Sequence, residues 1–334
     1  MIQLECNLAF FSELSLSTKA CSSRIFELTN FAYASETILV ILATTLIIIL
    51  VNRYKTARAL LEEKNHALNM IENQNVVLKQ KEKDITDSLI YAQRIQEARL
   101  PSEKYFRKHF PSSFIFLKPR DIVSGDFYLI GEKKQWIYII AADCTGHGIS
   151  GALMSMIGME IIEKAMNECD ITKPSKILSY IDESLEKIFS HEKSRGDVIM
   201  DGMDVGVCAI NKQERKIIYS GALFPMYIIS DNSLTQIKAD KVIIGMNPDR
   251  LSYTDHEINI KENDVLYLFS DGYADQFGGA ENKKFMYRRF RYLLLNIHKF
   301  NAEDQKLILE ENLENWMGDS PQVDDIMVIG FKPL

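Results

Sequence analysis

The sequence predicts an α+β fold from Ser102 onward, with largely antiparallel sheets and helices packed against them. Short apolar, β-branched runs there alternate with helical patterns. Several neighbouring runs are joined by very short turns, such as 212–215 and 223–225. Parallel strands need a crossover of a dozen or more residues, so these neighbours are expected to be antiparallel. Two helical segments of a different kind precede this domain and are expected to be a transmembrane helix and a coiled-coil helix.

The expected elements follow from hydrophobic periodicity and from turn residues. The expected strands cover residues 114–118, 126–131, 136–142, 203–211, 216–221, 226–230, 253–260, 265–270 and 326–331. The expected helices cover residues 150–168, 174–190, 284–298 and 302–317.

Composition limits the class of protein. The chain has 334 residues, of which 46% are hydrophobic, and a net charge of -7. That length is large for a single domain, and the apolar fraction is enough for a sizeable core. The negative charge argues against a nucleic-acid binder, whose footprint would be basic. The five cysteines show no CxxC pattern and are expected to be free thiols.

An uncharged aliphatic run covers residues 37–51. About 20 residues are needed to cross a bilayer core, and extension back to Phe31 supplies them at the cost of Glu36. The alternatives are a buried core strand or a cleaved signal peptide. A signal peptide carries positive charge before its apolar run, whereas Arg53, Lys55 and Arg58 follow this one. We expect a transmembrane helix over 36–56, a short extracytoplasmic segment of unassigned structure over 1–35, and a cytoplasmic C-terminal side.

Residues 57–100 lack proline and glycine and read as one long helix that ends at Pro101. A heptad frame places apolar side chains at seven of ten core positions. Asn75 at one core position is typical of a register-fixing residue in a parallel dimer, while Lys64 and Glu82 weaken the seam. The pattern favours a coiled-coil homodimer over an unpaired, solvated spacer helix.

Aspartates recur where predicted strands begin or end. Asp143 closes an apolar strand and precedes the glycine-rich stretch TGHGISGA, Asp126 follows Gly125, and Asp271 follows another apolar strand. Asp324 and Asp325 precede the last strand. Each aspartate alone has an ordinary explanation as a turn residue or cap. Four such turns in one domain favour a shared site.

Unpaired carboxylates that cluster repel one another, and hard divalent cations such as Mg²⁺ or Mn²⁺ relieve that repulsion. The sequence shows no CxxC or HExxH motif for a softer metal. Four carboxylates and two divalent ions form a nearly neutral centre that can accept a phosphate dianion and polarise a bridging water. We therefore expect two Mn²⁺ or Mg²⁺ ions.

Five ordered motifs, SGDFY, AADCTGHGISGA, GMDVGVCAIN, FSDGYADQFGG and QVDDIMVIGF, resemble the SpoIIE-like branch of the PPM (protein phosphatase 2C-type) serine/threonine phosphatases. The resemblance covers about residues 90–334 and implies an αββα sandwich with a metal pair between its sheets. By motif it implies Asp126, Asp143, Asp271 and Asp324 as catalytic metal ligands, with the Cys144 carbonyl as a backbone ligand. It also implies attack by a metal-bridged hydroxide on phosphoserine or phosphothreonine, in substrates that are often STAS-type anti-sigma-factor antagonists of partner-switching pathways.

The chain departs from the pattern of the classical protein phosphatase 2C enzymes at two places. Thr145 stands where many of them carry a histidine two residues after the bridging aspartate, so an acid role does not transfer to His147. Asp325 stands at an asparagine position and is expected to be structural. The turn at 275–279, with residues 283–285, is either a substrate-facing flap or an ordinary surface loop.

The sequence thus favours a membrane-anchored, metal-dependent phosphoprotein phosphatase with its domain at 101–334 in the cytoplasm. A catalytically silent scaffold that binds a phosphoprotein is the main alternative, although four intact aspartates argue against it. A metal-dependent phosphodiesterase acting on nucleotides is the third.

Overall fold

The computed structural model describes residues 2–167, 171–193, 201–247 and 252–334. The chain separates into two compact units, residues 1–83 and 84–334.

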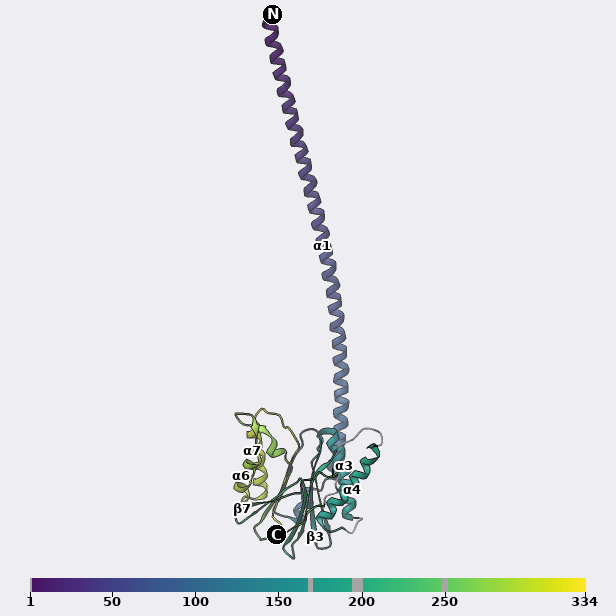
Figure 1. Ribbon diagram of the computed structural model, residues 1–334, viewed down its shortest axis with the longest axis vertical. Helices are drawn as coiled ribbons and strands as arrows, with labels where there is room; N and C mark the ends of the chain where they lie inside the picture. The colour runs from purple at the N-terminus through teal and green to yellow at the C-terminus, as the bar shows by residue number, and fades with distance from the viewer. Residues whose placement is uncertain (1, 168–170, 194–200, 248–251) are drawn as a thin grey trace. The chain divides into compact units, whose positions relative to one another are not determined.

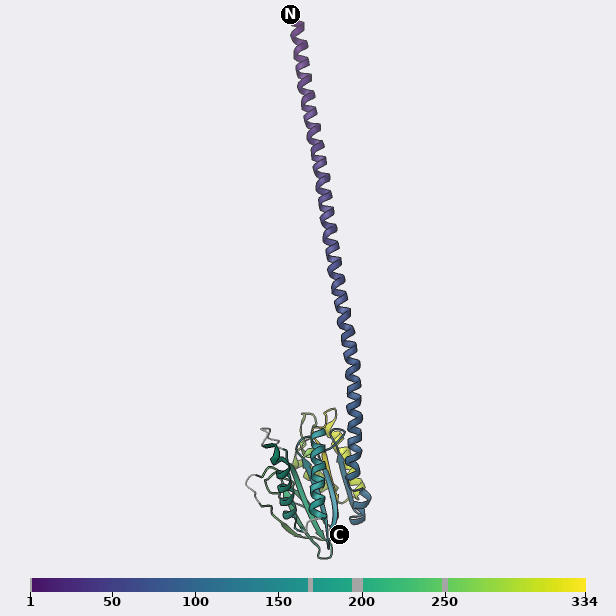
Figure 2. The ribbon, with the colours of Figure 1, turned by 90° about the vertical axis from the view of Figure 1, so that its right-hand side faces the viewer.

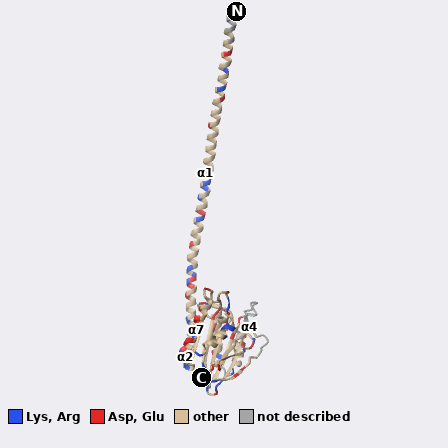
Figure 3. Ribbon diagram, turned by 90° about the vertical axis from the view of Figure 1, so that its left-hand side faces the viewer, with Lys and Arg blue, Asp and Glu red and all other residues tan. Residues whose placement is uncertain are grey.

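The first unit is the greater part of helix α1 (Ile2–Arg99). An uncharged stretch of α1 lies between charged segments (Figure 3), and its most apolar 18-residue window has a mean hydropathy of 2.4 with no residue buried. By length and composition, α1 can cross a membrane. The segments expected at 36–56 and 57–100 belong to this one continuous helix, and the unassigned residues before them are helical from Ile2 onward.

The second unit contains two five-stranded antiparallel sheets. Sheet A has the order β1 (Ser113–Lys118), β12 (Ile326–Phe331), β9 (Val265–Phe269), β6 (Met226–Ser230) and β7 (Ser233–Ile237). Sheet B has the order β2 (Phe127–Lys133), β3 (Trp136–Cys144), β4 (Met203–Asn211), β5 (Lys216–Ala222) and β8 (His256–Asn259). Sequential strands in sheet B pair as hairpins, in agreement with the short turns.

Helices cover the outer faces of both sheets, so the domain is an αββα sandwich (Figures 1 and 2). Helices α3 (Gly148–Asn167) and α4 (Pro174–Lys193) pack on sheet B through one apolar cluster. Helices α6 (Tyr287–Ile297) and α7 (Ala302–Met317) pack on sheet A through another. A third cluster joins the inner faces of the two sheets. The predicted α+β class with two antiparallel sheets is confirmed.

Most expected elements lie within a few residues of the observed ones. The expected strand at 253–260 is shorter, as β8, and residue 168 of the expected helix 150–168 lies outside the described residues. Five short elements escaped sequence reasoning: α2 (Glu103–His109), β7, α5 (Gly272–Asp275), β10 (Phe277–Gly278) and β11 (Lys283–Lys284). Strand β7 lacks an apolar pattern because it is a largely exposed edge strand.

Candidate metal centre

Strand pairing brings the predicted aspartates to one end of the sandwich. In sheet B, Asp126 precedes β2 and Asp143 is the penultimate residue of β3, and the pairing of Phe127 with Ala142 places the two at the same sheet end. In sheet A, Asp271 follows β9 as the N-cap of α5, and Asp324 precedes β12. Each sheet therefore contributes two of the four aspartates.

Two hydrogen bonds join the sheets at this end. The Ser270 hydroxyl, at the end of β9, donates to Asp126 Oδ2 at 2.6 Å. The backbone N–H of Gly125 donates to Asp325 Oδ2 at 2.7 Å. The other oxygen of Asp325 accepts from the backbone N–H of Arg120, also at 2.7 Å. Asp325 is buried, and it holds the backbone next to Asp126, which agrees with the structural role expected for it.

Burial and mutual repulsion shape the titration of the two carboxyl groups from sheet B. Burial raises the pKa of Asp126 well above its ordinary value, and the charges of Asp325 and Asp324 raise it further, against the hydrogen bond from Ser270. Burial also raises the pKa of Asp143, and the charges of Asp126, Asp271, Asp324 and Asp204 add to the effect. Asp143 is thus within electrostatic reach of all three other predicted ligands.

The carboxyl groups from sheet A lie closer to solvent. Burial of the carboxyl group raises the pKa of Asp271 to about 6, with the charges of Asp275 and Asp324 contributing, although the residue as a whole reaches the surface. Burial also raises the pKa of Asp324, while a hydrogen bond from the Asp325 N–H and the nearby His147 and Arg120 oppose the shift. These pKa shifts indicate that Asp271 and Asp324 lie close enough for their negative charges to repel each other.

Asp204 belongs to the same site and was missed by sequence reasoning. It pairs directly with Asp143 across β3 and β4. Burial and the charge of Asp271 raise its pKa to about 7. The available signal was a carboxylate at the second position of an otherwise apolar predicted strand, where a charged side chain needs a partner.

The glycine-rich stretch after Asp143 packs tightly on the loop that carries Asp126. A Cβ atom at Gly151 would lie 2.4 Å from the Gly146 carbonyl and 3.1 Å from Gly125 Cα, so position 151 has no room for a side chain. A Cβ at Gly125 would lie 3.3 Å from the Cys144 carbonyl. Burial, reinforced by the charge of Asp143, raises the pKa of the Cys144 thiol, which is buried and unpaired.

The residue that replaces the usual histidine has a structural function. Thr145 Oγ1 accepts from the Gly202 N–H at 2.9 Å and donates to the Gly202 carbonyl at 3.1 Å. This ties the loop to the start of β4, next to Asp204. His147 is exposed, and its Nδ1 lies 3.2 Å from Asp121 Oδ2. The geometry gives His147 a surface contact at hydrogen-bond distance with Asp121.

The donor set suits a hard divalent cation. Asp126 Oδ1 is buried without a hydrogen-bond partner among the described residues, although the other carboxylate oxygen is bonded. A buried carboxylate oxygen without a partner is costly, and an oxygen-preferring cation would satisfy it. No three His, Cys, Asp or Glu side chains in the described part of the chain form a ready-made ligand set. Two observations therefore support a divalent cation at this site: the buried Asp126 oxygen that has no hydrogen-bond partner in that part of the chain, and the repulsion among the carboxylates.

Known proteins share this architecture. The SiaA-PP2C domain of Pseudomonas aeruginosa is 31% identical, with a TM-score of 0.69, and the match covers 75% of this chain and 98% of that one. A structure of the PP2C phosphatase domain of SpoIIE from Bacillus subtilis, together with a fragment of its regulatory domain, is 18% identical with a TM-score of 0.51. The match covers 66% of this chain and 61% of that one, and it shows the fold alone.

Two curated relatives come from Bacillus subtilis (strain 168). The phosphoserine phosphatase RsbP is 28% identical over 159 residues, which are 46% of this chain and 37% of RsbP. The phosphoserine phosphatase RsbU is 26% identical over 162 residues, which are 47% of this chain and 44% of RsbU. The alignments thus span less than half the length of either relative.

Together, the αββα sandwich and its interfacial carboxylates define a domain of the protein phosphatase 2C class. The family model of stage II sporulation protein E (SpoIIE) matches residues 133–333, well over half of the chain. The chain belongs to the SpoIIE family. Asp143, Asp204, Asp271 and Asp324 lie inside the matched region, and Asp126 lies just before it.

Proposed function

We propose that this chain is a membrane-anchored, Mn²⁺- or Mg²⁺-dependent phosphatase of phosphoserine and phosphothreonine proteins. The observation that carries the proposal is the set of aspartates from both sheets that raise one another's pKa around the orphaned Asp126 oxygen. Family membership and the likeness to the SiaA-PP2C domain support it.

In this proposal Asp126, Asp143, Asp271 and Asp324 hold the cations, together with the Cys144 backbone carbonyl. When bound, the cations would offset the carboxylate charges, bind phosphate oxygens and lower the pKa of a water. Ser270 fixes the orientation of Asp126 through the 2.6 Å hydrogen bond between the sheets. Asp325 fixes the Gly125 backbone, so the loop that carries Asp126 keeps its position.

The proposed substrate is a regulatory phosphoprotein, with a STAS-type anti-sigma-factor antagonist as the first candidate. RsbP and RsbU are named phosphoserine phosphatases, and their likeness to this chain covers 46% and 47% of it. A protein substrate also agrees with a site that opens at the end of two sheets, where Asp271 reaches solvent.

The N-terminal helix supplies the proposed membrane anchor and dimer contact. We infer one membrane crossing at 36–56, with residues 1–35 outside and the phosphatase domain at 101–334 in the cytoplasm. We infer a parallel coiled coil over 57–100, because the apolar seam residues Leu61, Leu68, Ile71 and Leu78 are all more than half exposed in the single chain.

Purified full-length protein in detergent should release phosphate from a phosphoserine protein when Mn²⁺ is added, and a chelator should stop the reaction. Asp126→Asn and Asp271→Asn should each lower the rate by at least about a hundredfold, the loss of roughly 2.7 kcal/mol of transition-state stabilisation. Asp319→Asn is the matched control, because Asp319 is exposed and lies in a turn outside the site.

Two results would contradict the proposal. Binding of Mn²⁺ by calorimetry, without hydrolysis of any phosphoprotein tried or of p-nitrophenyl phosphate, would indicate a catalytically silent scaffold. Faster hydrolysis of bis-p-nitrophenyl phosphate than of the monoester would indicate a phosphodiesterase. Phosphoproteins that accumulate in a strain with Asp143→Asn would identify the substrate.

A further inference from the structure

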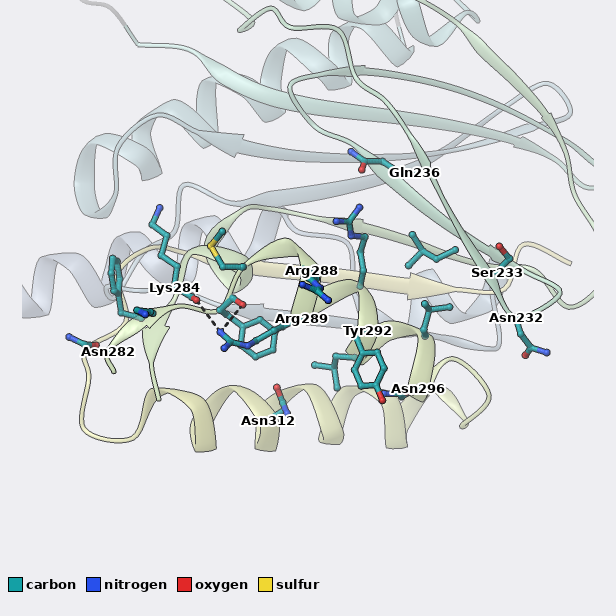
Figure 4. Close-up of a pocket in the computed structure, with 18 residues that line it drawn as sticks. Asn232, Ser233, Gln236, Asn282, Lys284, Arg288, Arg289, Tyr292, Asn296 and Asn312 are labelled. Carbon is teal, nitrogen blue, oxygen red and sulfur yellow. Dashed lines mark hydrogen bonds between the residues drawn. The ribbon is translucent and has the colours of Figure 1, made fainter. Parts of the chain in front are cut away.

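A groove of about 1610 Å³ runs along α6 on the outer side of sheet A (Figure 4). Strand β7 borders it with Ser233 and Gln236, the β10–β11 hairpin with Lys284, and α7 with Asn312. Among the described residues that line it, five are Lys or Arg and none is Asp or Glu. The groove is therefore basic in a chain whose net charge is -7.

Three of the five cations are engaged within the fold. Lys283 lies 2.5 Å from Glu281, and Lys284 lies 2.7 Å from Asp275. Arg289 stacks on the Trp316 ring at 4.5 Å and donates to two backbone carbonyls of the hairpin. These contacts fix the hairpin against α6 and α7.

Arg288 and Arg291 differ from those three. Neither has a carboxylate within ion-pair distance in the part of the chain that the structure describes. They are one turn apart on α6, so their side chains leave the same side of the helix. Arg288 is exposed and Arg291 is half-buried. Two neighbouring guanidinium groups without a carboxylate partner among the described residues are suited to carboxylates supplied by another molecule.

One wall of the groove is joined to the element that follows Asp271. Asp275, at the end of the short helix that Asp271 caps, holds Lys284 in the groove wall. Tyr287, the first residue of α6, lies within electrostatic reach of the centre: burial raises its pKa, and the charges of Asp271, Asp275 and Asp143 add to that rise. Lys284 and Tyr287 therefore connect the segment that carries Arg288 with the surroundings of Asp271.

Apolar surface accompanies the charge. Met286 is 56% exposed and Tyr292 is 70% exposed, and both line the groove. Figure 4 shows Tyr292 beside Asn296, with Asn312 on the facing helix α7. Aromatic, methionine and arginine side chains together are typical of protein-binding surfaces.

We propose that this groove docks an acidic segment of the phosphoprotein substrate, with Arg288 and Arg291 as the specificity-determining residues. The inference rests on the proposed phosphatase function, and it adds a recognition surface outside the metal centre. Docking there raises the local concentration of the phosphorylated residue at the aspartates without contact between the arginines and the phosphate.

The test uses full-length protein in detergent and two synthetic phosphoserine peptides, one flanked by glutamates and the other by glutamines. Fluorescence anisotropy in a chelator measures binding without turnover, and hydrolysis is measured separately with Mn²⁺. The wild type should bind the glutamate peptide about tenfold more tightly or better, and this preference should weaken as salt is added. Arg288→Glu with Arg291→Glu should abolish the preference and leave p-nitrophenyl phosphate hydrolysis unchanged.

Lys173→Glu with Lys176→Glu is the matched control, because these exposed lysines lie at the start of α4 on the opposite face of the sandwich. It should keep the preference. Equal binding of both peptides by the wild type would overturn the proposal, as would a preference that survives in the α6 double variant. Binding to phosphatidylglycerol vesicles in place of the peptide would assign the groove to lipid. If no phosphate ester is hydrolysed, the proposed phosphatase function is wrong. The anisotropy measurement still shows whether the groove binds the acidic peptide.

Discussion

Ser270 donates its hydroxyl hydrogen bond to Asp126 across the interface between the two sheets, at 2.6 Å. Its backbone N–H donates to the Met327 carbonyl, and its hydroxyl oxygen accepts from the Met327 N–H. Ser270 is thus fixed on sheet A while it orients a carboxylate of sheet B. Asp126 Oδ2 is held by this bond, and Oδ1 is buried without a hydrogen-bond partner among the described residues.

Ser270→Ala should weaken both the fold and the proposed metal site. The change leaves a buried carboxylate oxygen and the Met327 N–H without their present partner, and such losses cost about 1–3 kcal/mol. Urea unfolding should show the lower free energy of unfolding, and calorimetry should show weaker Mn²⁺ binding. Ser230→Ala, at the partly exposed end of β6, is the control. Unchanged Mn²⁺ affinity in Ser270→Ala would show that Asp126 needs no orienting bond.

Gln96 links the end of α1 to the same loop. Its side-chain amide donates to the Ser124 carbonyl at 2.6 Å and to Ser155 Oγ at 2.7 Å, and its carbonyl accepts from the Ser124 N–H at 3.1 Å. Ser124 Oγ in turn accepts from the Asp126 N–H at 3.1 Å. The last turn of α1 is therefore connected to Asp126, a proposed metal ligand, through two successive hydrogen bonds by way of Ser124.

Gln96→Ala should lower Mn²⁺-dependent turnover about tenfold, because it removes the hydrogen bonds that order this loop. A tenfold change corresponds to a loss of about 1.4 kcal/mol of transition-state stabilisation. Gln93→Ala is matched to it one turn earlier, where the side chain bonds to Glu97. It should change turnover by less than about twofold. A titration of Mn²⁺ separates weaker metal binding from slower chemistry. Equal turnover in the two variants would show that the Gln96 contact at the end of α1 does not affect activity at the site.

The four aspartates were predictable because each adjoins an apolar strand, which is a local signal. Ser270 was not predictable as a partner of Asp126, since 144 residues separate the two. Which strand ends meet is decided by the pairing of β12 with β9 and of β2 with β3, and periodicity does not encode that pairing. Asp204 was hidden inside an expected strand, where its apolar neighbours dominate the pattern.

The groove was equally hidden from the sequence. Strand β7 carries the polar sequence SLTQI on an exposed edge, and α6 begins three residues later than its pattern predicts. The basic residues of segment 283–291 appear in the sequence as an ordinary solvated run. Only the fold shows that Lys283, Lys284 and Arg289 are engaged, while Arg288 and Arg291 have no ion-pair partner among the described residues.

The stability of the metal-free protein should fall as pH rises. An aspartate in the unfolded chain has a pKa of about 3.9. Asp271 titrates at about 6 and Asp204 at about 7 in the fold, and the pKa values of Asp126 and Asp143 are also raised. A raised pKa favours folding fully below the unfolded value, and that contribution is lost as pH rises through the folded value. The loss should therefore lie between about pH 4 and pH 7.

Urea midpoints at pH 5 and pH 8 in a chelator measure this loss. Mn²⁺ should raise the midpoint at pH 8 more than at pH 5, because protonated carboxyl groups must release their protons before they bind a cation. A midpoint in chelator that is higher at pH 8 than at pH 5 would contradict the proposed repulsion.

Asp204→Asn should separate repulsion from metal binding. In the metal-free protein at pH 8 the wild-type carboxylate is charged, lies opposite Asp143 and faces the charge of Asp271. Its removal should raise the urea midpoint at pH 8 and flatten the dependence on pH between 5 and 8. If Asp204 also assists the cations, the same variant should gain less stability from Mn²⁺ than the wild type does. Asp231→Asn is the control, because Asp231 is 80% exposed and pairs with Lys261 away from the site. A lower metal-free midpoint for Asp204→Asn would mean that this carboxylate stabilises the fold by itself.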